Sequence, residues 1–247
     1  MLAVHVWLFS LGLSVAGSLV GLMVASVVLV FKQDVRRRVV PWLVSYAVGT
    51  LLGASLLHLV PEALEVLAPS AALTTMLVGI ITFFILEKAV LWRHCHEEEG
   101  CHVHRSTVPL VILGDAVHTF VDGVVIAAAT MTSIPLGVSA AVAVVAHEIP
   151  QEAGDFAVLL SAGLSRRRAL LLNITSAAGG VVGAAMMLAF GAQTPALVPF
   201  VLAFAAGNFL YVAMADLIPS LHSGQLDSSA VRQVLLIGAG IATIAIL

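Results

Sequence analysis

The sequence predicts an all-α membrane protein with eight transmembrane helices. Of the 247 residues, 60% are hydrophobic and 10% are charged, whereas about one quarter of the residues of a soluble domain are charged. Apolar stretches close to the ~20 residues that cross a bilayer recur along the whole chain. Because no linker, low-complexity run or shift in composition divides them, we expect residues 1–247 to form a single transmembrane domain in a lipid bilayer. A nucleic-acid partner is not expected.

The apolar stretches place the eight predicted spans at residues 4–31, 40–60, 73–92, 108–131, 136–163, 169–191, 196–218 and 229–247. No basic residue precedes the first stretch, and its apolar run is much longer than the hydrophobic region of a signal peptide. We therefore expect the first span to be retained as a helix.

The basic residues are confined to alternate loops and the span ends beside them. All eleven lie there, namely Lys32, Arg36, Arg37, Arg38, Lys88, Arg93, Arg105, Arg166, Arg167, Arg168 and Arg232. Positive charge in short loops marks the cytoplasmic side. This bias predicts that both termini are extracytoplasmic, in a plasma (inner) membrane. The two cysteines, Cys95 and Cys101, would then face a reducing cytosol, so a structural disulfide is not expected.

Spans 2 and 7 share a short internal similarity. In span 2, Gly49 is followed after eight residues by His58-Leu59-Val60-Pro61, and in span 7, Gly207 is followed after eight residues by Asp216-Leu217-Ile218-Pro219. The two spans run in opposite directions, as in the inverted repeats of transporters. The similarity predicts a repeat of spans 1–3 and 6–8 around spans 4 and 5.

Spans 4 and 5 carry polar side chains at mid-membrane depth. In span 4, VILGDAVHTFVDGVVIA, a spacing of four puts His118 and Asp122 on one helix face. In span 5, AHEIPQEAGDF, the same spacing pairs His147 with Gln151. Each histidine lies ~10 residues into its span, which is near the middle of a ~30 Å core. Four acids accompany them, namely Asp115 in span 4 and Glu148, Glu152 and Asp155 in span 5.

The expected partner of these acids is a divalent metal ion. A charged side chain at the bilayer centre costs at least ~2.5 kcal/mol, and neither span contains Lys or Arg. Imidazole is a good ligand for zinc and neighbouring transition metals. Pro150 cannot donate a hydrogen bond to the carbonyl of Ala146, so we also expect a kink or local opening beside His147, where a cavity could carry an ion.

Other readings of these residues stay open. The segment His147-Glu148-Ile149-Pro150-Gln151 differs by one residue from the HExxH zinc-protease signature, so an intramembrane zinc metalloprotease is one alternative, and a metal-gated channel or sensor is another. A protease of this type would need a second histidine where this chain has Gln151, and it would give His118 no role. Five polar residues lie further from the centre of the membrane. They could line the ion pathway or hold the ligands by hydrogen bonds, or they could only cap helices or be hydrated at span ends. They are Asp115, Asp155, His58, Glu62 and Asp216.

The motifs of spans 4 and 5 resemble those of the ZIP (Zrt/Irt-like protein) divalent metal transporters. HTFVDG is similar to the family pattern HNxxDG, and HEIPQEAGD is similar to HExPHExGD. The resemblance implies transport of a divalent metal into the cytoplasm, most often zinc, with iron, manganese or cadmium as other substrates. Zinc would be a transported substrate and not a cofactor, and no enzymatic activity is expected. A homodimer is a further expectation.

By position, the resemblance places four residues at one metal site, namely His118, Asp122, His147 and Gln151. It places Thr119 and Glu148 at a second, adjacent site, and Glu152 is a further candidate ligand. Two substitutions depart from the family pattern, because Thr119 replaces asparagine and Gln151 replaces histidine or glutamate. Span 6 also lacks the carboxylate that binuclear members have. The first site is therefore the better supported one.

A histidine- and cysteine-containing loop is expected on the cytoplasmic side at residues 93–107. Its sequence RHCHEEEGCHVHR matches no closed zinc motif, and its glutamates and glycine favour a solvated loop. The alternative is a cytoplasmic metal acceptor or sensor. The candidate ligands are His94, Cys95, His96, Cys101, His102 and His104.

Overall fold

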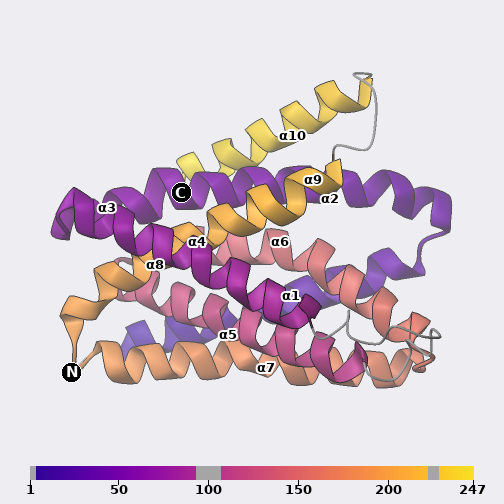
Figure 1. Ribbon diagram of the computed structural model, residues 1–247, viewed down its shortest axis with the longest axis horizontal. Coiled ribbons are helices and arrows are strands. Elements are labelled where there is room, and N and C mark those ends of the chain that lie inside the picture. The colour runs from indigo at the N-terminus through magenta and orange to yellow at the C-terminus, as the bar shows by residue number, and fades with distance from the viewer. Residues whose placement is uncertain (1–3, 93–106, 222–227) are drawn as a thin grey trace.

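A computed structural model describes residues 4–92, 107–221 and 228–247, and these are almost entirely helical (Figure 1). The helices are α1 (Val4–Val30), α2 (Gln33–Gly53), η1 (Ala54–Leu59), α3 (Val60–Val66), α4 (Pro69–Trp92), α5 (Thr107–Thr132), α6 (Ile134–Ser161), α7 (Arg166–Gly191), η2 (Pro195–Leu197), α8 (Val198–Tyr211), η3 (Val212–Leu217), α9 (Ile218–Leu221) and α10 (Ser228–Ala245). The predicted all-α class is confirmed.

Within the described residues, seven helical segments are long and apolar enough to cross a membrane, and Ala230–Ala245 forms a shorter apolar helix. They correspond in order to the eight predicted spans. The second and seventh segments are longer than predicted, covering Arg38–Val66 and Pro195–Leu221. In both, an α-helix continues through a π-helical segment, η1 or η3, into a further α-helical turn.

The π-helical segments lie just before a proline. Pro61 is in the first turn of α3, and Pro219 is in the first turn of α9. Because the helix is continuous at both positions, each proline removes an N–H that would otherwise bond to a carbonyl of the preceding turn, and the π-helical turn lies where that bond is lost. By contrast, α6 stays helical from Ile134 to Ser161 through Pro150. The loss of one N–H donor at Pro150 therefore does not end α6, and the helix continues without a break past His147.

Four helix pairs make the most extensive contacts: α5 with α7, α1 with α6, α2 with α10, and α4 with α8. Figure 1 shows α10 lying along α2 at one edge of the bundle and α7 lying along α5 at the other. The helices that carry the predicted site, α5 and α6, also contact each other directly. The chain therefore has a group formed by α1, α5, α6 and α7 beside a group that includes α2, α4, α8 and α10.

Glycine contacts in the second group support the inverted repeat. A Cβ atom added to Gly49 would lie 2.1 Å from the carbonyl oxygen of Ile237, and one added to Gly207 would lie 2.0 Å from that of Met76. The reverse contacts match as well, since Gly240 meets the carbonyl of Tyr46 at 2.4 Å and Gly79 meets that of Phe204 at 2.3 Å.

The matching contacts follow one correspondence along the sequence. Residues 46 and 49 of α2 correspond to 204 and 207 of α8, and residues 76 and 79 of α4 correspond to 237 and 240 of α10. The same offset in residue number that relates α2 to α8 also aligns η1 with η3. Small residues let helix backbones touch in this way. Spans 2 and 3 therefore pack on spans 8 and 7 in two equivalent crossings.

Candidate metal centre

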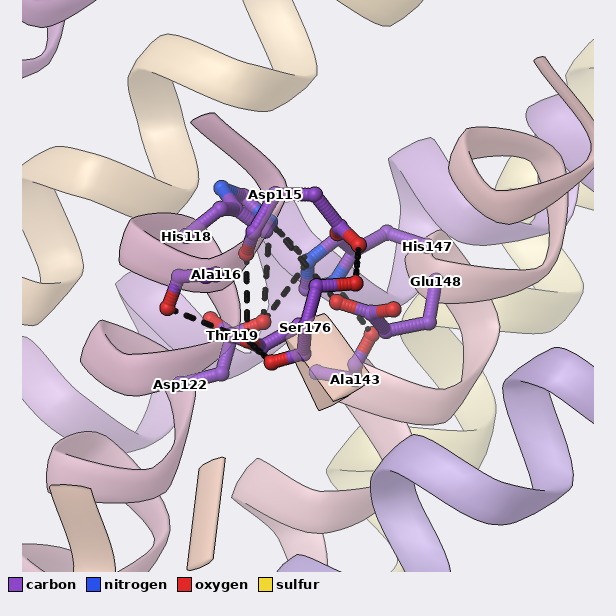
Figure 2. A network of polar contacts seen from close by, with 9 residues as sticks. All are labelled: Asp115, Ala116, His118, Thr119, Asp122, Ala143, His147, Glu148 and Ser176. Atoms are coloured by element: carbon purple, nitrogen blue, oxygen red, sulfur yellow. Dashed lines mark hydrogen bonds and ion pairs between the residues drawn. The ribbon is translucent and has the colours of Figure 1, made fainter. Parts of the chain in front are cut away.

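Four of the predicted side chains meet between α5 and α6. His118 and Asp122 extend from α5, and His147 and Glu148 extend from α6 (Figure 2). One ligand atom from each residue lies within 4.8 Å of the others. The two imidazole Nε2 atoms are 3.0 Å apart. Asp122 Oδ2 lies 3.3 Å from Nε2 of His147 and 3.5 Å from Nε2 of His118.

A backbone carbonyl orients His147. Its Nδ1 lies 2.9 Å from the carbonyl oxygen of Ala143, and a carbonyl only accepts, so Nδ1 carries the proton. In the neutral imidazole, Nε2 is then the unprotonated nitrogen and presents its lone pair toward His118 and Asp122. Metal-bound histidines are commonly held by such a bond at the other ring nitrogen. The ring of His147 also packs edge-on against Phe209 of α8.

The carboxylates of this cluster are buried, and in the described residues neither forms an ion pair with Lys or Arg. Asp122 is 2% exposed and Glu148 is 0% exposed, and residues 106–165 contain no Lys or Arg. Both oxygens of each carboxylate lack a hydrogen-bond partner within the part of the chain that the structure describes. Buried polar groups are rarely left in that state. A bound cation would satisfy them.

Glu148 also belongs to a second cluster. One oxygen each of Asp115, Glu148 and Glu152 lie within 4.8 Å of one another. The hydroxyl of Ser176 on α7 donates a hydrogen bond to Oδ2 of Asp115 (Figure 2). Sequence reasoning treated Asp115 as an outlying group and did not identify Ser176, because a lone serine in an apolar helix carries no signal of its own.

Comparison with known proteins agrees with this geometry. The description "ZIP Zinc transporter" belongs to a family profile that matches residues 4–109 and 93–247, which together cover nearly the whole chain. The chain belongs to the ZIP zinc transporter family. It is thus an integral membrane protein, and its membership of a transporter family argues against the metalloprotease alternative.

Several ZIP proteins are similar to this chain in sequence. Zinc transporter ZIP13 of Pongo abelii is 35% identical over 216 residues, which cover 81% of this chain and 64% of that protein. Zinc transporter ZIP4 of Homo sapiens is 32% identical over 245 residues, covering 72% of this chain and 38% of ZIP4. Zinc transporter ZIP10 of Danio rerio is 42% identical over 118 residues, covering 48% and 14%. The chain thus spans less than two thirds of the length of these relatives.

Two residues of the ZIP motifs lie apart from the four clustered side chains. The hydroxyl of Thr119 lies 3.0 Å from the carbonyl oxygens of both Asp115 and Ser176, and 3.2 Å from that of Ala116. It therefore joins α5 to α7. Gln151 is half-buried on α6, one turn after His147.

The predicted pathway residues lie outside both carboxylate clusters, apart from Asp115. His58 in η1 is linked to Ser139 of α6 by a 2.6 Å hydrogen bond between Nδ1 and Oγ. Glu62 lines a pocket between the ends of α3, α5, α7 and α8. Asp155 is half-buried on α6, and Asp216 is exposed on η3. The candidate loop ligands, from His94 to His104, lie outside the described residues.

Proposed function

We propose that this protein transports a divalent transition-metal ion, zinc first of all, across the membrane into the cytoplasm. The observation that carries the proposal is the convergence of two imidazoles and two carboxylates, from His118, Asp122, His147 and Glu148, at one buried point. Gln151 would add a neutral oxygen from the next turn of α6. Iron, manganese and cadmium are the other ions that this ligand set would accept.

The spacing of the ligand atoms supports zinc. In a tetrahedral site with bonds of ~2.0–2.1 Å, neighbouring ligand atoms are about 3.3–3.4 Å apart. The three separations among the Nε2 atoms of His118 and His147 and Oδ2 of Asp122 are 3.0, 3.3 and 3.5 Å. Glu148 Oε1, 3.9 Å from Nε2 of His118, needs only a small shift to complete the set.

The proposed direction of movement is inward, through a single transmembrane domain in the plasma (inner) membrane with both termini extracytoplasmic. His58 and Glu62 lie toward the outer end of span 2 in this orientation, and Asp155 and Asp216 lie toward the inner ends of spans 5 and 7. The loop at residues 93–107 would receive or sense the metal on the cytoplasmic side. A homodimer remains part of the proposal.

Uptake of zinc into proteoliposomes tests the proposal. We expect saturable uptake by the wild type and its loss in His147→Ala, because this variant removes one of two imidazoles. His5→Ala is the matched control, since His5 is an exposed histidine on α1 and its variant should retain uptake. Uptake that is equal in the wild type and His147→Ala would contradict the site. Cleavage of a membrane substrate that depends on Glu148 would favour the metalloprotease instead.

A further inference from the structure

We propose that Phe83 of α4 and Phe209 of α8 are positioning residues, which hold the two imidazoles of the metal centre in the orientation that binds the ion. The proposal rests on the proposed function and deepens it. A phenyl ring offers no ligand atom of its own, so both residues would act through the histidines. They would set how tightly the site binds its ion.

Four aromatic rings form one continuous row through the metal centre. The ring of Phe83 packs edge-on against that of His118, with centroids 6.1 Å apart and an interplanar angle of 78°. The rings of His118 and His147 follow at 5.3 Å and 84°, and those of His147 and Phe209 at 5.9 Å and 62°. Edge-to-face pairs at this spacing are a favoured arrangement of aromatic rings. Each imidazole is therefore held between the other imidazole and one phenyl ring.

The two phenylalanines are themselves held in place by the crossing of α4 and α8. Both side chains are buried. Phe83 comes four residues after Gly79, and Phe209 comes two residues after Gly207. At these two glycines the backbones of α4 and α8 are in contact, as small residues allow. The separation of the two helices is thus fixed close to the points where they present their phenyl rings.

His118 depends more on such support than His147 does. Nδ1 of His147 is held by the carbonyl oxygen of Ala143. The polar contacts of His118 in the described part of the chain all involve Nε2, the nitrogen at the site. No backbone carbonyl of the described residues anchors its other ring nitrogen, so the edge-on contact with Phe83 supports the ring from outside the site. A ligand that is already oriented costs less to order when the ion binds.

The supporting rings come from the other helix group. The histidines lie on α5 and α6, which pack with α1 and α7, whereas the phenylalanines lie on α4 and α8. A displacement of one group against the other would withdraw both phenyl rings together, because α4 and α8 are joined at their glycine crossing. The imidazoles would then rotate more freely and bind the ion less tightly. This coupling matters because an ion must leave the site as well as enter it.

Leucine variants with matched controls test the proposal. Phe83→Leu and Phe209→Leu remove a ring and keep an apolar side chain. Phe84→Leu and Phe200→Leu are the controls, because these phenylalanines are exposed on the same two helices. Zinc binding to the purified full-length protein in detergent should be measured by calorimetry, below the unfolding temperature of every variant.

We expect the Kd for zinc to rise in both variants that lose a buried ring. The loss of one edge-to-face contact corresponds to about a two- to tenfold change in Kd. Phe83→Leu should lie near the upper end and Phe209→Leu near the lower end, because His147 keeps its bond to the carbonyl of Ala143. The controls should match the wild type. A Kd equal to that of its control overturns the inference for that phenylalanine.

Co²⁺ in place of zinc reports the geometry of the ligands directly. We expect its visible ligand-field bands to change in Phe83→Leu and to stay unchanged in Phe84→Leu. A lower unfolding temperature of Phe83→Leu with unchanged Co²⁺ bands would overturn the inference, since it would show that the ring only fills space.

Zinc uptake separates this inference from the proposed function. In proteoliposomes, Phe83→Leu should need a higher zinc concentration for half-maximal uptake than Phe84→Leu does. Saturable uptake by the wild type, with the same half-maximal concentration in both variants, would overturn this inference and leave the proposed function standing. Absence of zinc uptake by the wild type would overturn the proposed function.

Discussion

Gly21 of α1 lies directly against Glu148 of α6, and a Cβ atom added to Gly21 would be 2.7 Å from Cβ of Glu148. The contact means that α1 fixes the position of a carboxylate that belongs to both ligand clusters. The motifs of spans 4 and 5 do not predict this contact, because Gly21 lies more than a hundred residues before Glu148 in the chain.

We expect Gly21→Ala to reduce zinc uptake by about tenfold or more. Overpacking of a buried contact costs about 1–3 kcal/mol, and here the atom that must move carries a proposed ligand. Gly12→Ala is the matched control, because a Cβ at Gly12 would have no atom within 4 Å. Uptake should be measured at equal amounts of folded protein. Equal rates in the two variants would show that α1 does not constrain Glu148.

Replacement of Gln151 should change the preference among metals. In Gln151→His, a nitrogen ligand joins the cluster, so we expect zinc to compete more strongly against manganese. In Gln151→Glu, an added negative charge should favour the harder manganese ion. Maximal flux is expected to stay level or fall in Gln151→His, because an ion that is bound more tightly leaves more slowly.

Competitive uptake of zinc and manganese in the three proteins measures this preference. The same ratio in wild type, Gln151→His and Gln151→Glu would mean that Gln151 packs or forms hydrogen bonds but does not bind the ion.

The two equivalent glycine crossings should contribute comparably to stability. We expect Gly49→Ala and Gly207→Ala each to destabilise the protein by about 1–3 kcal/mol, because each new methyl group would meet a backbone carbonyl and force two helices apart. Thermal unfolding in detergent detects the change. Gly238→Ala, at a position with no atom within 4 Å of the added Cβ, should be at least as stable as the wild type. If one crossing tolerates alanine without loss, the two halves are not equivalent in packing.

Deletion of residues 94–104 should leave the intrinsic zinc transport rate within a few fold of the wild type and alter its response to cytoplasmic metal. The reason is position, since the distribution of basic residues predicts a cytoplasmic loop here, whereas the histidines of spans 4 and 5 are predicted at mid-membrane depth. Uptake should be compared in proteoliposomes with and without zinc in the lumen. Complete loss of uptake in a folded deletion variant would place the loop in the transport pathway.

The membrane class, the order of the spans and the pairing of candidate ligands within one helix follow from the sequence. Composition and apolar length decide which segments enter a bilayer, and the helical repeat decides that His118 and Asp122 share a face. These are properties of one segment at a time. The repeat of spans 2 and 7 is also visible in the sequence, because a glycine and a proline recur at the same spacing in both spans.

How the faces that carry the candidate ligands combine depends on tertiary packing. The sequence spacing puts His147 and Glu148 on neighbouring faces of α6. In the structure both side chains nevertheless reach His118 and Asp122 of α5, because the edge between these two faces is turned toward α5. Three further contacts also depend on the rotation and depth at which separate helices meet. They are the approach of Asp115 to Glu152, the hydrogen bond of Thr119 to α7, and the contact of Gly21 with Glu148. Periodicity sets the faces of a helix, but packing against neighbours sets which faces touch.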